Sequence, residues 1–141
     1  MTYTIHVRII NASPKDFAVV EQTVWYYADG GVWTYADDIR TLTMNGSGTS
    51  GVLRFRGSDG EEFLVPLGVH NYKRWCDIVP DLAPGDTAMK VQPEYYNSGA
   101  RGEMLWKQLE EISKKSAKGT QIDVKYTSEK DTVFTVHITI A

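Results

Sequence analysis

Strict alternation of apolar and polar side chains marks both ends of this chain. In residues 2–10 the odd-numbered positions are apolar, and residues 122–126 and 134–140 repeat the pattern on even-numbered positions. Successive side chains of a strand point to opposite faces, so each segment is predicted to be a strand with one buried face. A turn is predicted at 128–131, between the last two strands.

The middle of the chain consists of shorter apolar runs separated by turn residues. Runs rich in β-branched and aromatic residues, bounded by glycine, asparagine or aspartate, are typical of strands. We therefore expect further strands at 23–27, 32–35, 41–44, 52–56 and 62–69. The sequence Ser58-Asp59-Gly60 predicts a hairpin between the last two of them.

Two segments lose the alternation and predict helices. Residues 71–82 are expected to form a short helix, and residues 104–118 repeat apolar side chains at steps of three and four. Gly119 follows where a C-terminal helix cap belongs. Strands with one apolar face must bury it against another layer. The predicted fold class is α+β, mainly β, with two stacked sheets and a helical insert before the last two strands.

Bulk properties exclude several classes of protein. A chain of 141 residues predicts one domain over 1–141, and a net charge of −3 argues against a nucleic-acid partner. Cys76 is the single cysteine, so no internal disulfide can form. The alternating N-terminus does not resemble a secretory signal and no apolar run is long enough to span a membrane, which predicts a cytoplasmic protein.

Residues 68–79 carry the most unusual mixture of side chains in the chain. An imidazole, an amide, a phenol, an indole, two cations and a carboxylate lie between Gly68 and Val79. Buried polar groups need partners, so few protein cores contain such a set. A surface that binds a small polyhydroxylated ligand suits it, because the Asn71 amide both donates and accepts hydrogen bonds. Tyr72 and Trp75 can cover the apolar face of a sugar ring.

Each of these features also has a structural interpretation. The glycine-rich segment 46–51 is either a hairpin connection or a surface that a ligand approaches closely; it lacks the lysine of a phosphate-binding loop. Asp29-Gly30 is a common hairpin corner. A histidine at a strand end is more often structural, so His70 is given a supporting role, and Trp75 is favoured as a core residue.

Catalytic and metal-binding interpretations are poorly supported, and we expect no enzyme activity, no cofactor and no metal. The acidic residues come as adjacent pairs, as at 37–38, 61–62 and 110–111. Adjacent side chains on a strand point to opposite faces and cannot share one substrate. His6 and His137 would be close if the two terminal strands pair, but two imidazoles make a weak metal site. Cys76 is interpreted as a buried thiol.

The segments 46–51 and 70–77, together with residues 27–31, 53–55 and 117–119, closely resemble the fungal fruit-body lectin family. This resemblance implies an actinoporin-like β-sandwich whose sheets are joined by a helix–loop–helix, assembled as a homotetramer or possibly a dimer. It implies a glycan partner, with a first site for the T-antigen disaccharide galactose-β1,3-N-acetylgalactosamine or a related galactosyl glycan. A defence role is implied as well. The first site would use Ala28, Asp29, Gly30, Ser47, Gly48, His70, Asn71 and Tyr72.

The resemblance also implies a second site for terminal N-acetylglucosamine, formed by Asp77, Ile78, Val79, Pro80 and Arg101. Related sequences have threonine at position 80 and a tyrosine that corresponds to Ile112. Proline has no amide hydrogen and isoleucine has no hydroxyl, so this site is expected to be weakened or lost. Asp29 and Asn45 also depart from the family pattern, which has asparagine and glycine there.

Two alternatives compete with a lectin. An actinoporin-like toxin needs an amphipathic N-terminal helix, whereas residues 2–10 have the period of a strand, so no membrane insertion is expected. The aromatic residues at 25–27 and 95–96 could lie at a membrane interface, although packing in the sandwich or a subunit contact is favoured. The other alternative is a protein-interaction module that binds no sugar.

Overall fold

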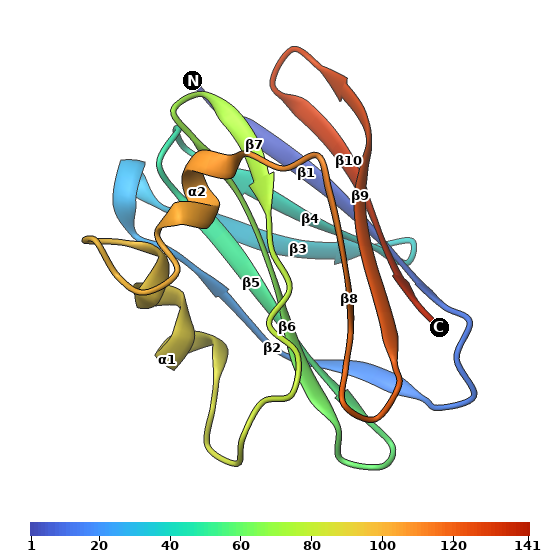
Figure 1. Cartoon of the computed structure of the whole chain (residues 1–141). Coiled ribbons are helices and arrows are strands. Elements are labelled where there is room, and N and C mark those ends of the chain that lie inside the picture. Colours follow the sequence, from blue (N-terminus) through green and yellow to red (C-terminus); the bar gives the residue numbers. More distant parts are fainter.

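The computed structural model describes residues 1–141 as ten strands in two packed sheets (Figure 1). The first sheet has six strands, in the order β3 (Gly31–Ala36), β4 (Ile39–Met44), β1 (Tyr3–Asn11), β10 (Val133–Ile140), β9 (Gln121–Lys130), β8 (Glu111–Lys115). The second has four, in the order β2 (Phe17–Val24), β5 (Ser50–Gly57), β6 (Glu62–His70), β7 (Lys73–Cys76). The terminal strands β1 and β10 pair in parallel at the centre of the first sheet.

The alternating segments bury one face each, as predicted from the sequence. A cluster of 21 buried residues fills the space between the sheets, with Ile5, Val136 and Phe63 among them. Burial of one such side chain stabilises the fold by about 1.5–3 kcal/mol. The two-sheet sandwich is therefore held by the alternation that the sequence displays.

A helical segment joins the two sheets and covers the outer face of the smaller one. It leaves β7 and enters β8 through α1 (Ala88–Val91), η2 (Gln92–Tyr95) and α2 (Glu103–Lys107). A second apolar cluster of ten residues packs beneath it, including Leu64, Trp75 and Leu105. Strand β6 is consequently buried on both faces. The expected helix–loop–helix between the sheets is confirmed. None of the helices is long and apolar enough to cross a membrane.

The predicted helix at 104–118 is wrong beyond its first turn. Helix α2 ends at Lys107, because Gln108 adopts the left-handed conformation with φ of 48°. Residues 111–115 then pair with β9 as strand β8. Gly119 lies in the turn between β8 and β9, with φ of +89°, and caps no helix. Spacing of apolar residues across two successive elements imitated a helical period.

The predicted helix at 71–82 is also wrong. Asn71 and Tyr72 form the two-residue turn of a hairpin between β6 and β7, because His70 pairs with Lys73. Trp75 is fully buried on β7, which confirms it as a core residue although it lies on a strand. The turn, a four-residue strand and an irregular stretch follow one another too closely for any single period to appear.

Three connections between strands lie together at one end of the sandwich, where the chain reverses direction. Strand β2 ends at Val24, earlier than the predicted strand at 23–27, and η1 (Tyr27–Asp29) then carries the chain across to β3 in the other sheet. Residues 45–49 cross from β4 back to β5, so the hairpin interpretation of the glycine-rich segment is wrong. The β6–β7 turn is the third. The other predicted hairpin, at 58–60, does join β5 to β6.

Candidate functional site

Hydrogen bonds tie the three reversals to one another. The Tyr72 N–H donates to Ser47 Oγ over 2.9 Å, and the Gly48 N–H donates to the Val69 carbonyl over 2.9 Å. On the other side the Asn45 amide donates to the Asp29 carbonyl over 2.8 Å. The glycine-rich segment thus links the 27–30 segment to the β6–β7 turn. The three segments singled out from the sequence lie together.

The reversals are built from strained backbone. Asn71 and Tyr72 have φ of 51° and 66°, so both residues of the β6–β7 turn are left-handed. This geometry is that of a type I′ hairpin, which strongly favours glycine at the second position. A residue with a Cβ costs roughly 1–2 kcal/mol there. Strain of this kind concentrates at functional sites, and here it holds Tyr72 with 75% of its surface exposed.

A small hollow of about 280 Å³ opens where the turn meets the glycine-rich segment. Gly48 contributes with φ of +107°, and a Cβ there would point into open space. The lining offers hydroxyl, amide, imidazole and aromatic groups and no formal charge at neutral pH. Its residues are Ser47, Gly48, His70, Asn71, Tyr72 and Trp106.

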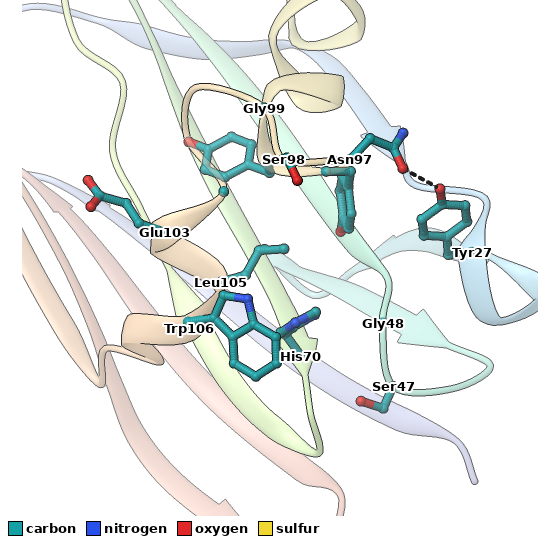
Figure 2. Close-up of a pocket in the computed structure, with 13 residues that line it drawn as sticks. Tyr27, Ser47, Gly48, His70, Asn97, Ser98, Gly99, Glu103, Leu105 and Trp106 are labelled. Atoms are coloured by element: carbon teal, nitrogen blue, oxygen red, sulfur yellow. Dashed lines mark hydrogen bonds between the residues drawn. The ribbon is translucent and has the colours of Figure 1, made fainter.

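His70 is the most unusual group of the small hollow. Its ring lies edge-on to Trp106 with centroids 4.5 Å apart, as Figure 2 shows. Both ring nitrogens are buried and neither has a hydrogen-bond partner. Burial lowers the pKa of His70, so the ring is neutral at pH 7. A neutral imidazole has one donor and one acceptor, and leaving both unpaired is rare away from functional sites.

A larger hollow of about 630 Å³ adjoins the small one. Figure 2 shows the residues that line the larger hollow. The two share Ser47, Gly48, His70 and Trp106. The rest of the larger hollow comes from Tyr27 and from the helical segment. Trp106, on α2, stands at the junction with 64% of its surface exposed.

Sequence reasoning missed Trp106 and the rest of the larger hollow. The spacing of residues 104–118 predicts one helix whose apolar face includes positions 104, 105, 108 and 109. On such a helix Trp106 would lie on the solvent face. A large exposed aromatic on a predicted solvent face is the signal that would have identified it.

Three predicted first-site residues do not line either hollow. Ala28, Asp29 and Gly30 lie behind the glycine-rich segment, and Ala28 and Asp29 are left-handed. A Cβ added to Gly46 would lie 3.0 Å from the Ala28 Cβ. The close approach of the two segments therefore favours glycine at position 46, and residues 28–30 support the small hollow without lining it.

Three of the residues predicted for a second site, Asp77, Ile78 and Val79, are buried in the interior of the protein. Asp77 is buried and accepts a hydrogen bond of 2.6 Å from the Tyr95 hydroxyl. Lys114 lies 3.6 Å from the same carboxylate and donates to the Ile78 carbonyl over 2.8 Å. None of the five predicted residues, Asp77, Ile78, Val79, Pro80 and Arg101, lines a hollow of this structure.

Other candidate residues have structural surroundings. Trp25 stacks on Tyr96 with ring centroids 4.3 Å apart, so this part of the aromatic run packs in the fold. Cys76 is buried, and burial raises the pKa of its thiol to about 12. His6 and His137 lie on paired strands, but the register places them opposite Thr135 and Arg8.

Comparison with known proteins places this architecture. The family model of the fungal fruit body lectins matches residues 1–138. Boletus edulis lectin is 51% identical over 129 residues, which cover 90% of each chain. The crystal structure of wild-type Xerocomus chrysenteron lectin superposes with a TM-score of 0.97, at 45% identity over 100% of both chains. A mutated form of that lectin gives a TM-score of 0.98, at 45% identity over 100% of this chain and 99% of the other.

The family match and these relatives span nearly the whole chain, including all three reversals and both hollows. The two sheets and the helical segment that joins them have the same arrangement as in the solved lectins. The chain therefore belongs to the fungal fruit body lectin family and is a carbohydrate-binding lectin.

Proposed function

We propose that this lectin is non-catalytic and recognises galactose-β1,3-N-acetylgalactosamine, or a closely related galactosyl glycan, in the small hollow. The observation that carries the proposal is the pair of unpartnered His70 nitrogens in a hollow lined by amide, hydroxyl and aromatic groups. The glycan class itself follows from the resemblance of Ser47, Gly48, His70, Asn71 and Tyr72 to the family pattern.

The groups of the hollow divide the recognition of a sugar between them. The Asn71 amide can donate to and accept from ring hydroxyls, and a neutral His70 offers one further donor and one further acceptor. Tyr72 and Trp106 cover the apolar C–H faces. Each hydrogen bond exchanged with water yields only about 1 kcal/mol net. We expect one site to bind with a Kd on the order of 0.1–1 mM.

Weak single sites make multivalency useful. Linking several sites in one assembly raises avidity by ~10²–10⁴ without new contacts. We propose a homotetramer, or a dimer, that presents several small hollows to one glycosylated surface. Sedimentation velocity measures the state directly, and a monomer at micromolar concentration contradicts this part of the proposal.

We further propose that the second, N-acetylglucosamine site is weakened or lost. Pro80 supplies no amide hydrogen, Ile112 supplies no hydroxyl, and Asp77 is buried with its Oδ2 accepting from Tyr95. Titration with N-acetylglucosamine is expected to show no saturable binding in the millimolar range. Saturable binding that T-antigen does not compete would refute this loss.

Replacement of Asn71 by glycine tests the first site. Asn71 is left-handed with φ of 51°, so alanine would add backbone strain that glycine avoids. Asn71→Gly is expected to lower affinity for the T-antigen disaccharide at least tenfold and to abolish agglutination of cells that bear it. The melting temperature should stay within about 2 °C, because the change affects an exposed side chain. Retained agglutination removes Asn71 from the site, and a flat glycan array refutes the glycan assignment altogether.

A further inference from the structure

We propose that the larger hollow is an additional subsite that binds a further, uncharged sugar residue attached to the disaccharide in the small hollow. This inference rests on the proposed function. It predicts that the preferred ligand of this lectin is a trisaccharide or longer glycan, and that Trp106 and Asn97 set the preference.

The two hollows are continuous, so one ligand can occupy both. Ser47, Gly48, His70 and Trp106 line both, so a ligand seated in one is in reach of the other. The larger hollow has a volume of about 630 Å³, against about 280 Å³ for the smaller. A ligand confined to the small hollow would leave most of the joint space to water. Only a longer ligand would use both.

The lining of the larger hollow has the chemistry of a sugar subsite. The Tyr27 hydroxyl donates to Asn97 Oδ1 over 3.0 Å, which orients the amide and leaves both Nδ2 hydrogens without a partner in the protein. Ser98 adds a hydroxyl beside it. Figure 2 shows Asn97 and Ser98 on one side of the hollow and the Trp106 and His70 rings on the other. A pyranose between them would meet donors at one edge and an aromatic face at the other.

The backbone that carries these groups is strained in the same way as the β6–β7 turn. Asn97 and Ser98 are left-handed, with φ of 55° and 61°. A Cβ at Gly99 would lie 2.4 Å from the Glu94 carbonyl oxygen, so the loop closes tightly on itself. The Arg101 N–H donates to the same carbonyl over 2.9 Å. Asn97 and Ser98 are therefore a second pair of polar residues on strained backbone beside the hollows. Strained backbone of this kind holds side chains in fixed positions at functional sites.

Charge restricts the sugar to an uncharged one. Glu103 carries the one formal charge of the lining, because burial keeps His70 neutral. Its carboxylate is exposed and points away from Asn97 and Trp106 in Figure 2, and the lining offers no cation that could pair with an anionic sugar. A neutral hexose or N-acetylhexosamine fits this lining, and a sialic acid does not.

The test compares the disaccharide with three extended glycans by calorimetric titration. One trisaccharide adds galactose at the reducing end, one adds N-acetylglucosamine to the N-acetylgalactosamine, and one adds N-acetylneuraminic acid. We expect at least one neutral trisaccharide to bind fivefold or more tightly than the disaccharide, and the sialylated one to show no gain. Asn97→Gly is the matched variant, because it removes an amide from another left-handed position. It should erase the gain and leave the Kd of the disaccharide within twofold.

The outcomes separate this inference from the proposed function. Normal disaccharide binding without any gain from either neutral trisaccharide overturns the subsite alone, as does a gain that survives in Asn97→Gly. A gain from the sialylated glycan overturns the preference for an uncharged sugar. Absence of binding by all four glycans refutes the proposed function and the subsite together. Circular dichroism of Asn97→Gly confirms that the variant is folded.

Discussion

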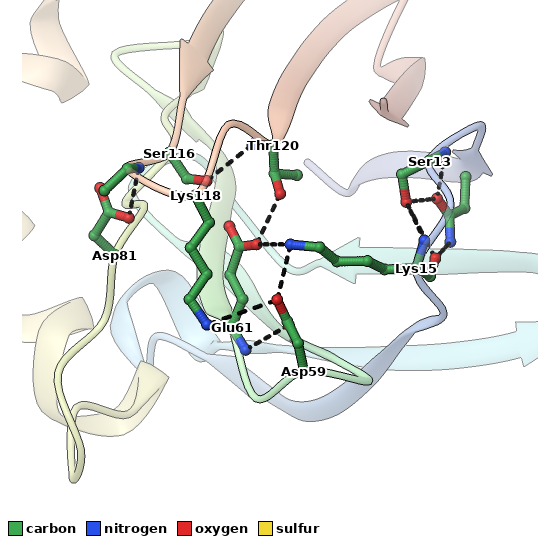
Figure 3. A network of polar contacts seen from close by, with 10 residues as sticks. Ser13, Lys15, Asp59, Glu61, Asp81, Ser116, Lys118 and Thr120 are labelled. Carbon is green, nitrogen blue, oxygen red and sulfur yellow. Dashed lines mark hydrogen bonds and ion pairs between the residues drawn. The ribbon is translucent and has the colours of Figure 1, made fainter.

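The two ends of the strand pair β5–β6 carry opposite kinds of polar chemistry. One end holds the small hollow, between Gly48 before β5 and His70 at the close of β6. The other end holds a network of charged groups around the β5–β6 turn (Figure 3). The polar network consists of Lys15, Asp59, Glu61, Lys118 and Thr120.

Charges in the polar network are paired with one another. Lys15 Nζ lies 2.8 Å from Asp59 Oδ2 and 3.0 Å from Glu61 Oε1, and the Thr120 hydroxyl donates to the same Glu61 oxygen over 2.7 Å. Burial acts to raise the pKa of Glu61, but the nearby Ser116 and Thr120 hydroxyls and the Lys15 ammonium outweigh it and lower that pKa. The hydrogen bond from Lys15 lowers the pKa of Asp59 to about 2.

The contrast shows how a structural cluster differs from the proposed binding site on the same scaffold. In the polar network the buried carboxylate of Glu61 has its ion-pair and hydroxyl partners, and only Oε2 lacks a hydrogen bond. In the small hollow both nitrogens of His70 and the Asn71 amide are free of intramolecular partners, and the backbone is strained. A ligand that supplies the missing partners would form hydrogen bonds with donors and acceptors that have no partner within the protein.

Removal of Glu61 should have the largest effect and should affect stability alone. Its side chain is 3% exposed, and Glu61→Ala leaves Lys15 and Thr120 without their shared acceptor. We expect a loss of about 3 kcal/mol in the free energy of unfolding, or about 10 °C in melting temperature. Sugar affinity should stay within twofold. Glu110→Ala, at an exposed carboxylate, is the control and should change stability by less than about 0.5 kcal/mol. An equal loss in both variants would show that the network has no special role.

The sequence predicted the sandwich because the period of a strand is a local property. The alternation of Ile5 and Val136 with their polar neighbours predicts which face of each strand is buried, whichever strand they pair with. The helix prediction for residues 104–118 failed because the segment contains two elements, α2 and β8, and the second is decided by pairing with a strand outside the segment. Pairing of Ile112 with Val124 on β9, together with the left-handed Gln108, overrides the helical spacing. Local periodicity carries no information about such pairing.

The site was predictable in part for the same reason. Segments 46–51 and 70–72 stood out by composition and by their family resemblance, and the structure brings them together. Trp106 and Asn97 come from the helical segment, whose path over the second sheet follows from tertiary packing of Trp75, Tyr95 and Leu105. No pattern near Trp106 in sequence reveals that it lies against His70.

Acid should affect the two ends in separate pH windows. The pKa of the His70 imidazole is lower in the folded protein than its value near 6.5 in the unfolded chain. Between these two values the unfolded chain binds a proton at His70 and the folded protein does not. Its contribution to stability is full above pH 6.5 and declines as the pH falls towards the lowered value. The carboxylate of Glu61 has a pKa below 4.5, so its contribution is full above pH 4.5 and is lost only at lower pH.

NMR titration of His70 and thermal melts from pH 8 to pH 3 measure both windows. Trp106→Ala uncovers the ring and should return the pKa of His70 towards 6.5. The loss of stability just below pH 6.5 should then disappear, and the loss below pH 4.5 should remain. Titration of His70 at or above pH 6.5 in the unmodified protein contradicts the burial of its ring. A lower window that persists unchanged in Glu61→Gln contradicts the role of that carboxylate.

Relief of strain at Tyr72 should give the smallest effect and the sharpest contrast, because stability and affinity are expected to change in opposite directions. Tyr72 is left-handed with φ of 66° and largely exposed, so Tyr72→Gly creates the Asn-Gly sequence that a type I′ turn prefers and loses little packing. We expect the free energy of unfolding to rise by about 1 kcal/mol and the melting temperature by about 3 °C. Affinity for the disaccharide should fall several-fold, since the aromatic wall of the small hollow is removed.

The matched change at the opposite end, Ser58→Gly, relieves no left-handed residue and should leave affinity unchanged. A Tyr72→Gly variant that binds the disaccharide normally would mean that the strain serves no recognition.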